Sequence, residues 1–246
     1  MPHIEIAAET LFSIFGFPVT NTLVMTWIVL VLLVYAAYRI SCTISIIPKT
    51  LQSIAEIIIE KFLGLMEGMM GSRTVAERYI PIVATIFIFI LISNWFGILP
   101  GVGSIGVYEQ HGAQQKFVPF FRSAASDLNV TLALGTLAVL LINITGMAVK
   151  GVGGHMNKFF SLRNPIDAFV GLLEFISEFA KIISFSFRLF GNIFAGEVLL
   201  IIVGFLAPFA APIPFLMLEL FVGFVQALVF AMLTMVFISI AVAQHH

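Results

Sequence analysis

Cysteine and charge are both scarce in this sequence, and each scarcity excludes a class of protein. The 246 residues contain one cysteine, Cys42, so no internal disulfide bond can form and no Cys/His cluster has the spacing of a zinc site. Asp, Glu, Lys and Arg make up only 10% of the chain and leave a net charge of −1, which gives no sign of nucleic-acid binding. A nucleotide-binding GxxxxGK[ST] motif is missing as well. We therefore expect no metal, no cofactor and no nucleic acid.

The termini and loops carry few residues that point to a ligand or to secretion. Residues 1–9 include Glu5 and Glu9 but no Lys or Arg, whereas a signal peptide begins with positive charge. The first hydrophobic segment is therefore expected to remain as a membrane span. The histidines are scattered, and we interpret them as solvated residues of termini and loops: His3, His111, His155, His245 and His246.

Hydrophobic residues are abundant, at 60% of the chain, and the mean hydropathy is +1.10. A soluble domain of this size cannot bury so much apolar surface, which places the chain among membrane proteins. A spanning helix needs about 20 mainly apolar residues. Five segments meet this length: roughly residues 22–40, 79–99, 130–149, 165–206 and 214–243.

The segment between the first two spans has a different pattern. Residues 48–70 place apolar side chains at i, i+3, i+4 and i+7, with Glu56, Glu60 and Glu67 between them, which predicts an amphipathic helix lying at the membrane interface. Residues 101–126 have no strong period and are predicted to form a polar loop. The fold predicted for residues 1–246 is a single all-α membrane domain with five transmembrane helices and one interfacial helix.

The distribution of Lys and Arg predicts the orientation of these spans. Positive residues stay on the cytoplasmic side of a membrane. Only Lys116 and Arg122 fall on the side of the N-terminus, while Lys181 and Arg188 lie within the fourth span. We therefore predict that the N-terminus is outside and the C-terminus is cytoplasmic. The remaining residues all fall on the opposite side: Arg39, Lys49, Lys61, Arg73, Arg78, Lys150, Lys158 and Arg163.

The fourth span is too long and too charged for an ordinary transmembrane helix. Residues 165–206 would extend about 60 Å, twice the hydrocarbon thickness of about 30 Å, so the helix must tilt steeply, break or leave the bilayer. A charge at the bilayer centre costs at least about 2.5–3.5 kcal/mol. Since Arg188 cannot lose its proton, it needs a carboxylate, water or both nearby. We therefore interpret Arg188 as a functional residue.

Helical geometry separates the polar residues of this span into two faces. At about 100° per residue, Asn192 lies about 40° from Arg188, whereas Glu197 lies about 180° away. Two polar environments on different faces are thus predicted near Arg188. The face of Arg188 also carries Glu174, Glu178 and Lys181, which interfacial snorkelling explains equally well.

The fifth span adds a carboxylate and an amide. Glu219 and Gln226 are seven residues apart, so they share a helical face and lie about 10 Å apart along the axis, where they could line a wet path. In the second span, Asn94 is interpreted as a helix-end cap and Trp95 as an interface anchor.

These residues resemble the signature of subunit a of F-type ATP synthases. The resemblance is carried by RLFGNIFAGE at residues 188–197, supported by SNWFGILP at 93–100, DLNVT at 127–131 and PVTNT at 18–22. It covers nearly the whole chain in order. Gly191 and Glu197 make the chain similar to bacterial rather than mitochondrial members, which implies the bacterial inner membrane.

The resemblance implies a partner and a mechanism. Subunit a of this family lies beside a rotating ring of c subunits, each with one essential carboxylate, in a complex that includes b subunits of the peripheral stalk. Its two long helices are steeply tilted and pack against the ring. It provides two offset half-channels, each open to one side of the membrane, and its arginine lies between them. Ion flow is thereby coupled to ring rotation, while ATP chemistry takes place on other subunits.

The resemblance also assigns roles to individual residues. Arg188 becomes the essential cation, with Asn192 and Gln226 as polar neighbours. Glu197 and Glu219 are expected to line the outer half-channel; family members often have a histidine at one of these positions, so two nearby carboxylates should titrate as a coupled pair. Glu174, Glu178 and Lys181 are candidates for the cytoplasmic half-channel, and Asn94, Asp127 and Asn129 are possible secondary residues.

Two other interpretations remain open. A secondary transporter or channel subunit would also place charges within the membrane, although such proteins often contain inverted repeats and this sequence has none. A purely structural membrane anchor would have no need for Arg188 in the middle of a helix.

Overall fold

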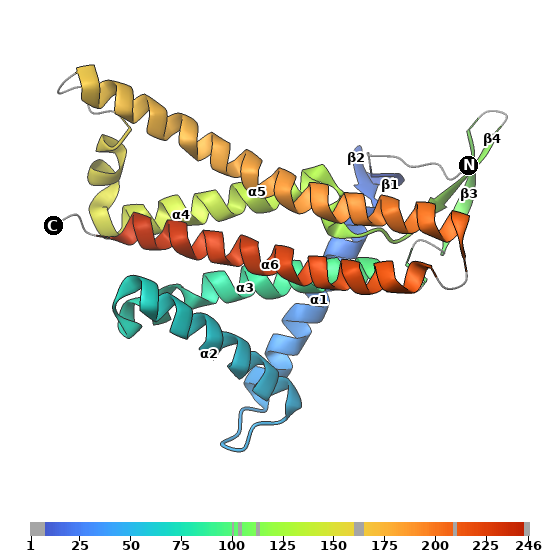
Figure 1. Cartoon of the computed structure of the whole chain (residues 1–246), viewed down its shortest axis with the longest axis horizontal. Coiled ribbons are helices and arrows are strands. Elements are labelled where there is room, and N and C mark those ends of the chain that lie inside the picture. Colours follow the sequence, from blue (N-terminus) through green and yellow to red (C-terminus); the bar gives the residue numbers. More distant parts are fainter. Residues whose placement is uncertain are drawn as a thin grey trace.

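Helices dominate the architecture. The structure is a computed structural model that describes residues 8–99, 101–102, 105–111, 114–159, 165–208 and 211–243. Figure 1 shows the helices α1 to α6 and two small hairpins at one end of the molecule. The helices are α1 (Asn21–Cys42), α2 (Thr50–Met70), α3 (Arg73–Ile98), α4 (Leu128–Asn157), α5 (Pro165–Leu206) and α6 (Pro212–Val242). The other elements are β1 (Thr10–Ile14), β2 (Phe17–Thr20), β3 (Gly106–His111), β4 (Gln114–Pro119) and the 3₁₀ turn η1 (Ala124–Ser126).

The predicted spans are confirmed as helices. Five of the described helices, α1, α3, α4, α5 and α6, are long and apolar enough to cross a membrane. The first begins directly after Thr20, its N-cap, whose side chain accepts a hydrogen bond from the backbone N–H of Leu23. The helix α3 starts at Arg73, six residues before the predicted span. The prediction began later because the first turns are polar and the span was recognised by its apolar run. The all-α membrane fold is thus correct.

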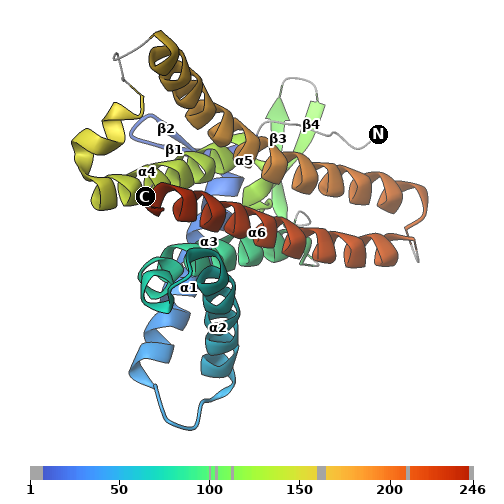
Figure 2. The same cartoon turned by 60° about the vertical axis from the view of Figure 1, so that its left-hand side comes forward.

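The amphipathic segment also forms the expected helix. One face of α2 packs on α3 through Phe62, Leu63 and Met66, which are buried, while the opposite face is exposed. The helix ends at Gly71, whose φ of 68° only glycine adopts without strain. In Figures 1 and 2, α1 and α2 diverge together from the bundle formed by the other helices.

The core lies where α3, α4, α5 and α6 meet. The helix α3 packs along α6, and α4 packs along α5. Leu189 and Ile193 of α5 are buried in this core beside Ala227 of α6, and the rings of Phe185 and Phe230 lie 4.6 Å apart. The small side chain on α6 allows the two long helices to approach each other.

The two hairpins correct the expectation that the connecting segments are irregular. Residues 101–126 were expected to form a polar loop, but they contain the antiparallel pair β3–β4, with Val107 opposite Val118, followed by η1. A second pair, β1–β2, precedes α1. Sheet pairing is made by backbone groups, so mixed polar sequences such as GVYEQH and QQKFVP form strands without an apolar period.

A kink in α4 changes the course of the chain after the third span. Gly151 has φ 75° and ψ 158°, which interrupts the helix, and the following residues bend toward the start of α5 (Figure 1). His155 consequently lies against Gly146 of its own helix and is only 5% exposed. The interpretation of His155 as a solvated loop residue is therefore wrong. The expectation for the other histidines is not tested: only the backbone of His111 is described, and three lie outside the described residues, His3, His245 and His246.

Candidate functional site

The arginine singled out in the sequence lies on the open face of α5. Arg188 is exposed, and its Nη2 donates a 3.1 Å hydrogen bond to Ser184 Oγ, one turn earlier. Among the described residues, no carboxylate lies within ion-pair distance of it. Asn192, one turn later, is exposed as well. The expected partner carboxylate of Arg188 is thus not supplied by the described part of this chain.

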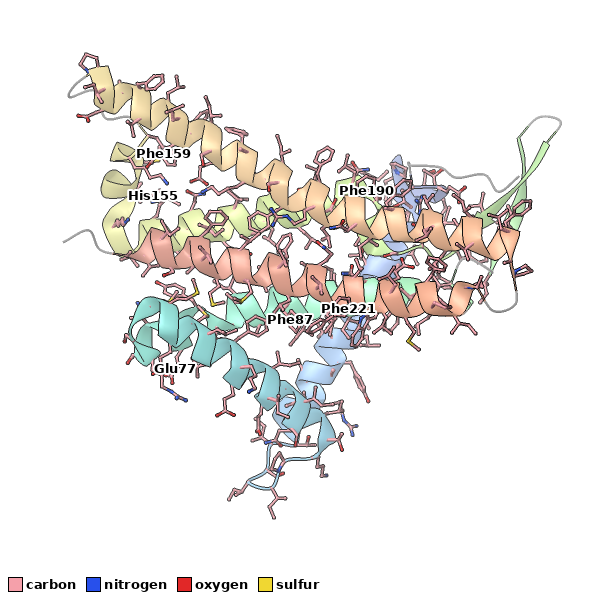
Figure 3. All side chains as sticks on the ribbon, in the orientation of Figure 1. Glu77, Phe87, His155, Phe159, Phe190 and Phe221 are labelled. Atoms are coloured by element: carbon pink, nitrogen blue, oxygen red, sulfur yellow. The ribbon has the colours of Figure 1, made fainter. Side chains whose placement is uncertain are left out.

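A cavity of about 470 Å³ brings together the two carboxylates expected in the outer half-channel. Glu197 comes from α5 and Glu219 from α6, and both line this space, which we call the outer cavity. Its walls also include the end of α3 and the segment before η1. Glu219 is buried and Glu197 is half-buried, and Figure 3 shows the two helices that carry them running side by side toward this end.

Arg122 is the principal residue of the outer cavity that sequence reasoning missed. Its Nε lies 3.1 Å from Glu197 Oε1, and its guanidinium lies 5.9 Å from the centre of the Phe194 ring. Arg122 is only 9% exposed. In the sequence, Arg122 was used only to predict orientation. Its position within a run of small and apolar residues just before Asp127 could have indicated burial.

Buried polar atoms without a hydrogen-bonding partner gather at the same cavity. Glu219 Oε2, Asn94 Oδ1 and Ser123 Oγ are all buried and have no hydrogen-bond partner among the described residues, and all three residues line the outer cavity. Buried polar groups are normally satisfied by protein or water. Their convergence indicates a polar space in which water could satisfy them.

Asn94, at the end of α3, does not play the role expected of it. Asn94 is not a helix cap: its Nδ2 donates to the carbonyl of Gly223 in α6 over 2.9 Å, and it is 1% exposed. Trp95 Nε1 likewise donates to the carbonyl of Leu220 over 3.1 Å. Together they attach α3 to the turns of α6 that follow Glu219.

Two glycines allow these close approaches. A Cβ on Gly196 would lie 2.9 Å from Glu219 Oε1, and a Cβ on Gly223 would lie 3.1 Å from that of Asn94. Gly196 precedes Glu197 directly, so α5 presents a carboxylate to the cavity and a bare backbone to the second carboxylate.

A second polar cluster lies toward the other end of α5. Its central residue is Glu178, whose Oε1 lies 2.7 Å from Lys181 Nζ and 3.3 Å from Lys158 Nζ. Lys158 also lies 3.6 Å from Glu174. These residues line a cavity of about 130 Å³, which we call the inner cavity. The structure therefore brings together Glu174, Glu178 and Lys181 as expected, and adds Lys158.

Asn143 and His155 complete the inner cluster and were not singled out in the sequence. Asn143 Nδ2 donates to Glu178 Oε2 over 3.1 Å, and His155 Nε2 lies 2.9 Å from Asn143 Oδ1. Asn143 carried one available signal, because it is a polar residue within a predicted span. His155 carried none, since it is the kink at Gly151 that brings it there.

The other possible secondary residues are structural in their contacts. Asp127 Oδ1 accepts from the backbone N–H of Asn129 as the N-cap of α4, and Asp127 Oδ2 accepts from Thr22 Oγ1 over 2.7 Å. This buried contact joins α1 to α4. The side chain of Asn129 is exposed, and Gln226 is half-buried on α6.

Arg188 lines neither the outer nor the inner cavity. It lies between them along α5, about 14 Å from Glu197 and about 21 Å from Glu174 by helical rise. In the described part of the chain, no group of three His, Cys, Asp or Glu residues could hold a metal ion. The arrangement is one fixed cation between two separate polar spaces.

Comparison with known proteins identifies the family of the chain. Residues 21–239 match the family model described as ATP synthase A chain. The chain belongs to this family. It is 32% identical to ATP synthase subunit a of Moorella thermoacetica, over 96% of each chain. It is also 34% identical to ATP synthase subunit a of Mycobacterium ulcerans, over 93% of this chain and 88% of the relative.

Proposed function

We propose that this chain is the stator subunit a of a bacterial rotary ATP synthase and that it provides two offset half-channels for proton translocation. The observation that carries the proposal is the position of Arg188, exposed on α5 between two separate polar cavities and included in neither. The family membership supports the same role.

In this proposal the outer cavity is the half-channel open to the outside. Glu197 and Glu219 line it and pass protons, and Arg122 holds Glu197 in place. The unpaired oxygens of Glu219 and Asn94 support a hydrated path, because a buried polar atom left without a partner costs about 1–3 kcal/mol unless water satisfies it.

The inner cavity is the cytoplasmic half-channel. Glu174, Glu178 and Lys181 line it, as the sequence suggested, and Lys158 adds a further cation. Its opposite position along α5 matches the distribution of Lys and Arg, which places the C-terminus in the cytoplasm and the N-terminus outside.

Arg188 needs a partner that lies outside the described part of this chain. The exposed side of α5 next to Arg188 also carries Phe187 and Gly191, an apolar and a small residue that suit another helix. We assign this face to the ring of c subunits, whose carboxylates would pair with Arg188 in turn. Asn192 and Gln226 would be its polar neighbours, the b subunits would anchor the chain, and α5 and α6 would tilt steeply.

The mechanism follows from electrostatics. A ring carboxylate that reaches Arg188 is attracted in its charged form, so its proton leaves into one half-channel. The charged group cannot enter lipid and takes up a proton from the other half-channel before it rotates away. The fixed guanidinium stops protons from passing directly between the half-channels. Ion flow is thereby coupled to rotation.

The test is ATP-driven proton pumping in inverted membrane vesicles. We expect Arg188→Ala to abolish pumping, and Arg188→Lys to remove most of it, since a lysine loses its proton more readily and lacks the planar fork. Arg39→Ala is the matched control, because Arg39 is an exposed arginine in the last turn of α1, far in the sequence from Arg188. Pumping at the wild-type rate in Arg188→Ala would refute the mechanism.

A further inference from the structure

The inner cluster contains a hydrogen-bonded series that begins on the end of α4 that follows the kink at Gly151. Figure 3 labels His155 and Phe159 on this segment, near the first turns of α5. Gly151 kinks the helix, and Gly146 leaves room for the imidazole, because a Cβ on Gly146 would lie 2.8 Å from His155 Cε1. The ring also contacts Phe159 edge-on, with centroids 5.7 Å apart. His155 is thus held from two sides.

The contacts of Asn143 fix the roles of the atoms. Its Nδ2 donates to Glu178 Oε2 over 3.1 Å and to the carbonyl of Val139 over 2.9 Å, which uses both amide hydrogens. Its Oδ1 is an acceptor, so His155 Nε2, at 2.9 Å, must be the donor. The imidazole and the carboxylate therefore contact opposite ends of one amide.

The orientation of this amide matters because its two ends are nearly equal in shape and opposite in polarity. Turned by 180°, Asn143 would direct Oδ1 at the Glu178 carboxylate and Nδ2 at the imidazole donor, and both contacts would be repulsive. The carbonyl of Val139 and the carboxylate of Glu178 exclude that orientation because both can only accept, and the N–H that His155 donates to Oδ1 further stabilises the retained one. His155 thereby supports the one bond to Glu178 Oε2 that comes from a neutral side chain, while the two lysines contact Oε1.

We infer that His155 is a positioning residue of the cytoplasmic half-channel: by donating to Asn143, it stabilises the amide orientation that holds the carboxylate of Glu178 in the inner cavity. The inference rests on the proposed function, since it concerns a residue of that path. The charged groups facing this point from α4 and α5 are Lys150, Lys158, Glu174, Glu178 and Lys181, all lining the same cavity. His155 acts through hydrogen-bond donation and does not itself carry the proton.

Three variants separate the hydrogen-bond donation of the His155 side chain from its titration and from its shape. His155→Phe keeps a ring but removes the donor; His155→Gln keeps an N–H donor but cannot titrate; Asn143→Leu removes the amide. ATP-driven pumping is measured in inverted vesicles over a range of bath pH, together with the amount of assembled complex. We expect His155→Phe and Asn143→Leu to lower pumping by about threefold to tenfold, the worth of one hydrogen bond, and to change its pH profile.

The conservative variant and the double variant test the route of action. His155→Gln is expected to pump within about twofold of wild type, since the bond it retains is worth about as much as the one it replaces. Adding His155→Phe to Asn143→Leu should cause no further loss, because His155 acts through Asn143. Equal loss in His155→Gln and His155→Phe would overturn the inference, as would a fully additive double variant or normal pumping in His155→Phe.

Glu178→Gln distinguishes this inference from the proposed function. If Glu178→Gln pumps with a normal rate and pH profile, the cytoplasmic path is wrong. If Glu178→Gln is impaired while His155→Phe and Asn143→Leu are normal, only the role of His155 is wrong. Where His155→Phe fails to assemble, the other two variants decide: impaired Asn143→Leu with active His155→Gln supports the inference, and any other combination overturns it.

Discussion

Gly196 offers a sharp test of the outer cavity, because the structure leaves no room for a side chain at this position. A Cβ added to Gly196 would lie 2.9 Å from Glu219 Oε1, 3.1 Å from Cδ and 3.3 Å from Cγ. Ordinary contacts begin at about 3.4 Å, near the van der Waals minimum. Gly196→Ala must therefore displace the Glu219 carboxylate by about half an ångström or more, while the backbone of α5 stays helical.

The magnitude follows from two opposing effects. Alanine favours a helix over glycine by about 1 kcal/mol, whereas overpacking costs about 1–3 kcal/mol. The net change in stability is thus small, and the main effect falls on the position of Glu219. Misplacing a reacting group by about 1 Å can cost about a hundredfold in rate, so a displacement of half that size predicts pumping reduced by about tenfold.

The assay is ATP-driven pumping in inverted vesicles, normalised to the amount of assembled complex. Gly204→Ala is the matched control, because a Cβ there meets nothing within 4 Å and lies on the same helix. Combining Gly196→Ala with Glu219→Asp, whose shorter side chain makes room, should restore part of the loss relative to additivity. If Gly196→Ala and Gly204→Ala pump equally well, the close approach of α5 to Glu219 is wrong.

Three further outcomes are expected. Arg122→Met should lower the thermal stability of the complex by leaving Glu197 without its cation, and adding Glu197→Gln should recover much of the lost stability. Equal stability of Arg122→Met and the double variant would contradict the ion pair. Thr22→Val should cost about 1.5–3 kcal/mol, seen as a lower unfolding temperature in detergent, because it removes a buried donor to the Asp127 carboxylate; an unchanged temperature would mean that this contact contributes nothing. Glu219→Gln should slow pumping and alter its dependence on the pH of the outer side, and an unaltered profile would remove Glu219 from the path.

The long helices could be predicted well because their signal is local. The limits of α5 agree with the prediction, since Pro165 fixes its start and no further proline interrupts the mainly apolar sequence as far as Leu206. The hairpin β3–β4 could not be predicted in the same way. Its pairing depends on backbone groups of two strands with mixed polar side chains, and neither strand has an apolar period.

The candidate site divides along the same line. Helical geometry separated Glu197 from the face of Arg188, and the structure agrees, because Glu197 lies in the outer cavity while Arg188 is exposed. Arg122 and His155 were not predicted as site residues because the partners of each, Glu197 and Asn143, are distant in the sequence. Asn94, interpreted as a cap, instead joins α3 to α6, a contact between residues 129 positions apart.

By itself, the sequence determined the membrane class, the helical spans, the family resemblance and the interpretation of Arg188 as functional. Each of these follows from local hydrophobicity, from the 100° step of a helix or from a contiguous motif. Only the tertiary structure decided which polar groups meet: Arg122 with Glu197, and His155 with Asn143 and Glu178. Charges in a membrane need partners, and those partners come from distant segments that packing brings together. For His155, the contact also depends on Gly151, whose positive φ kinks α4.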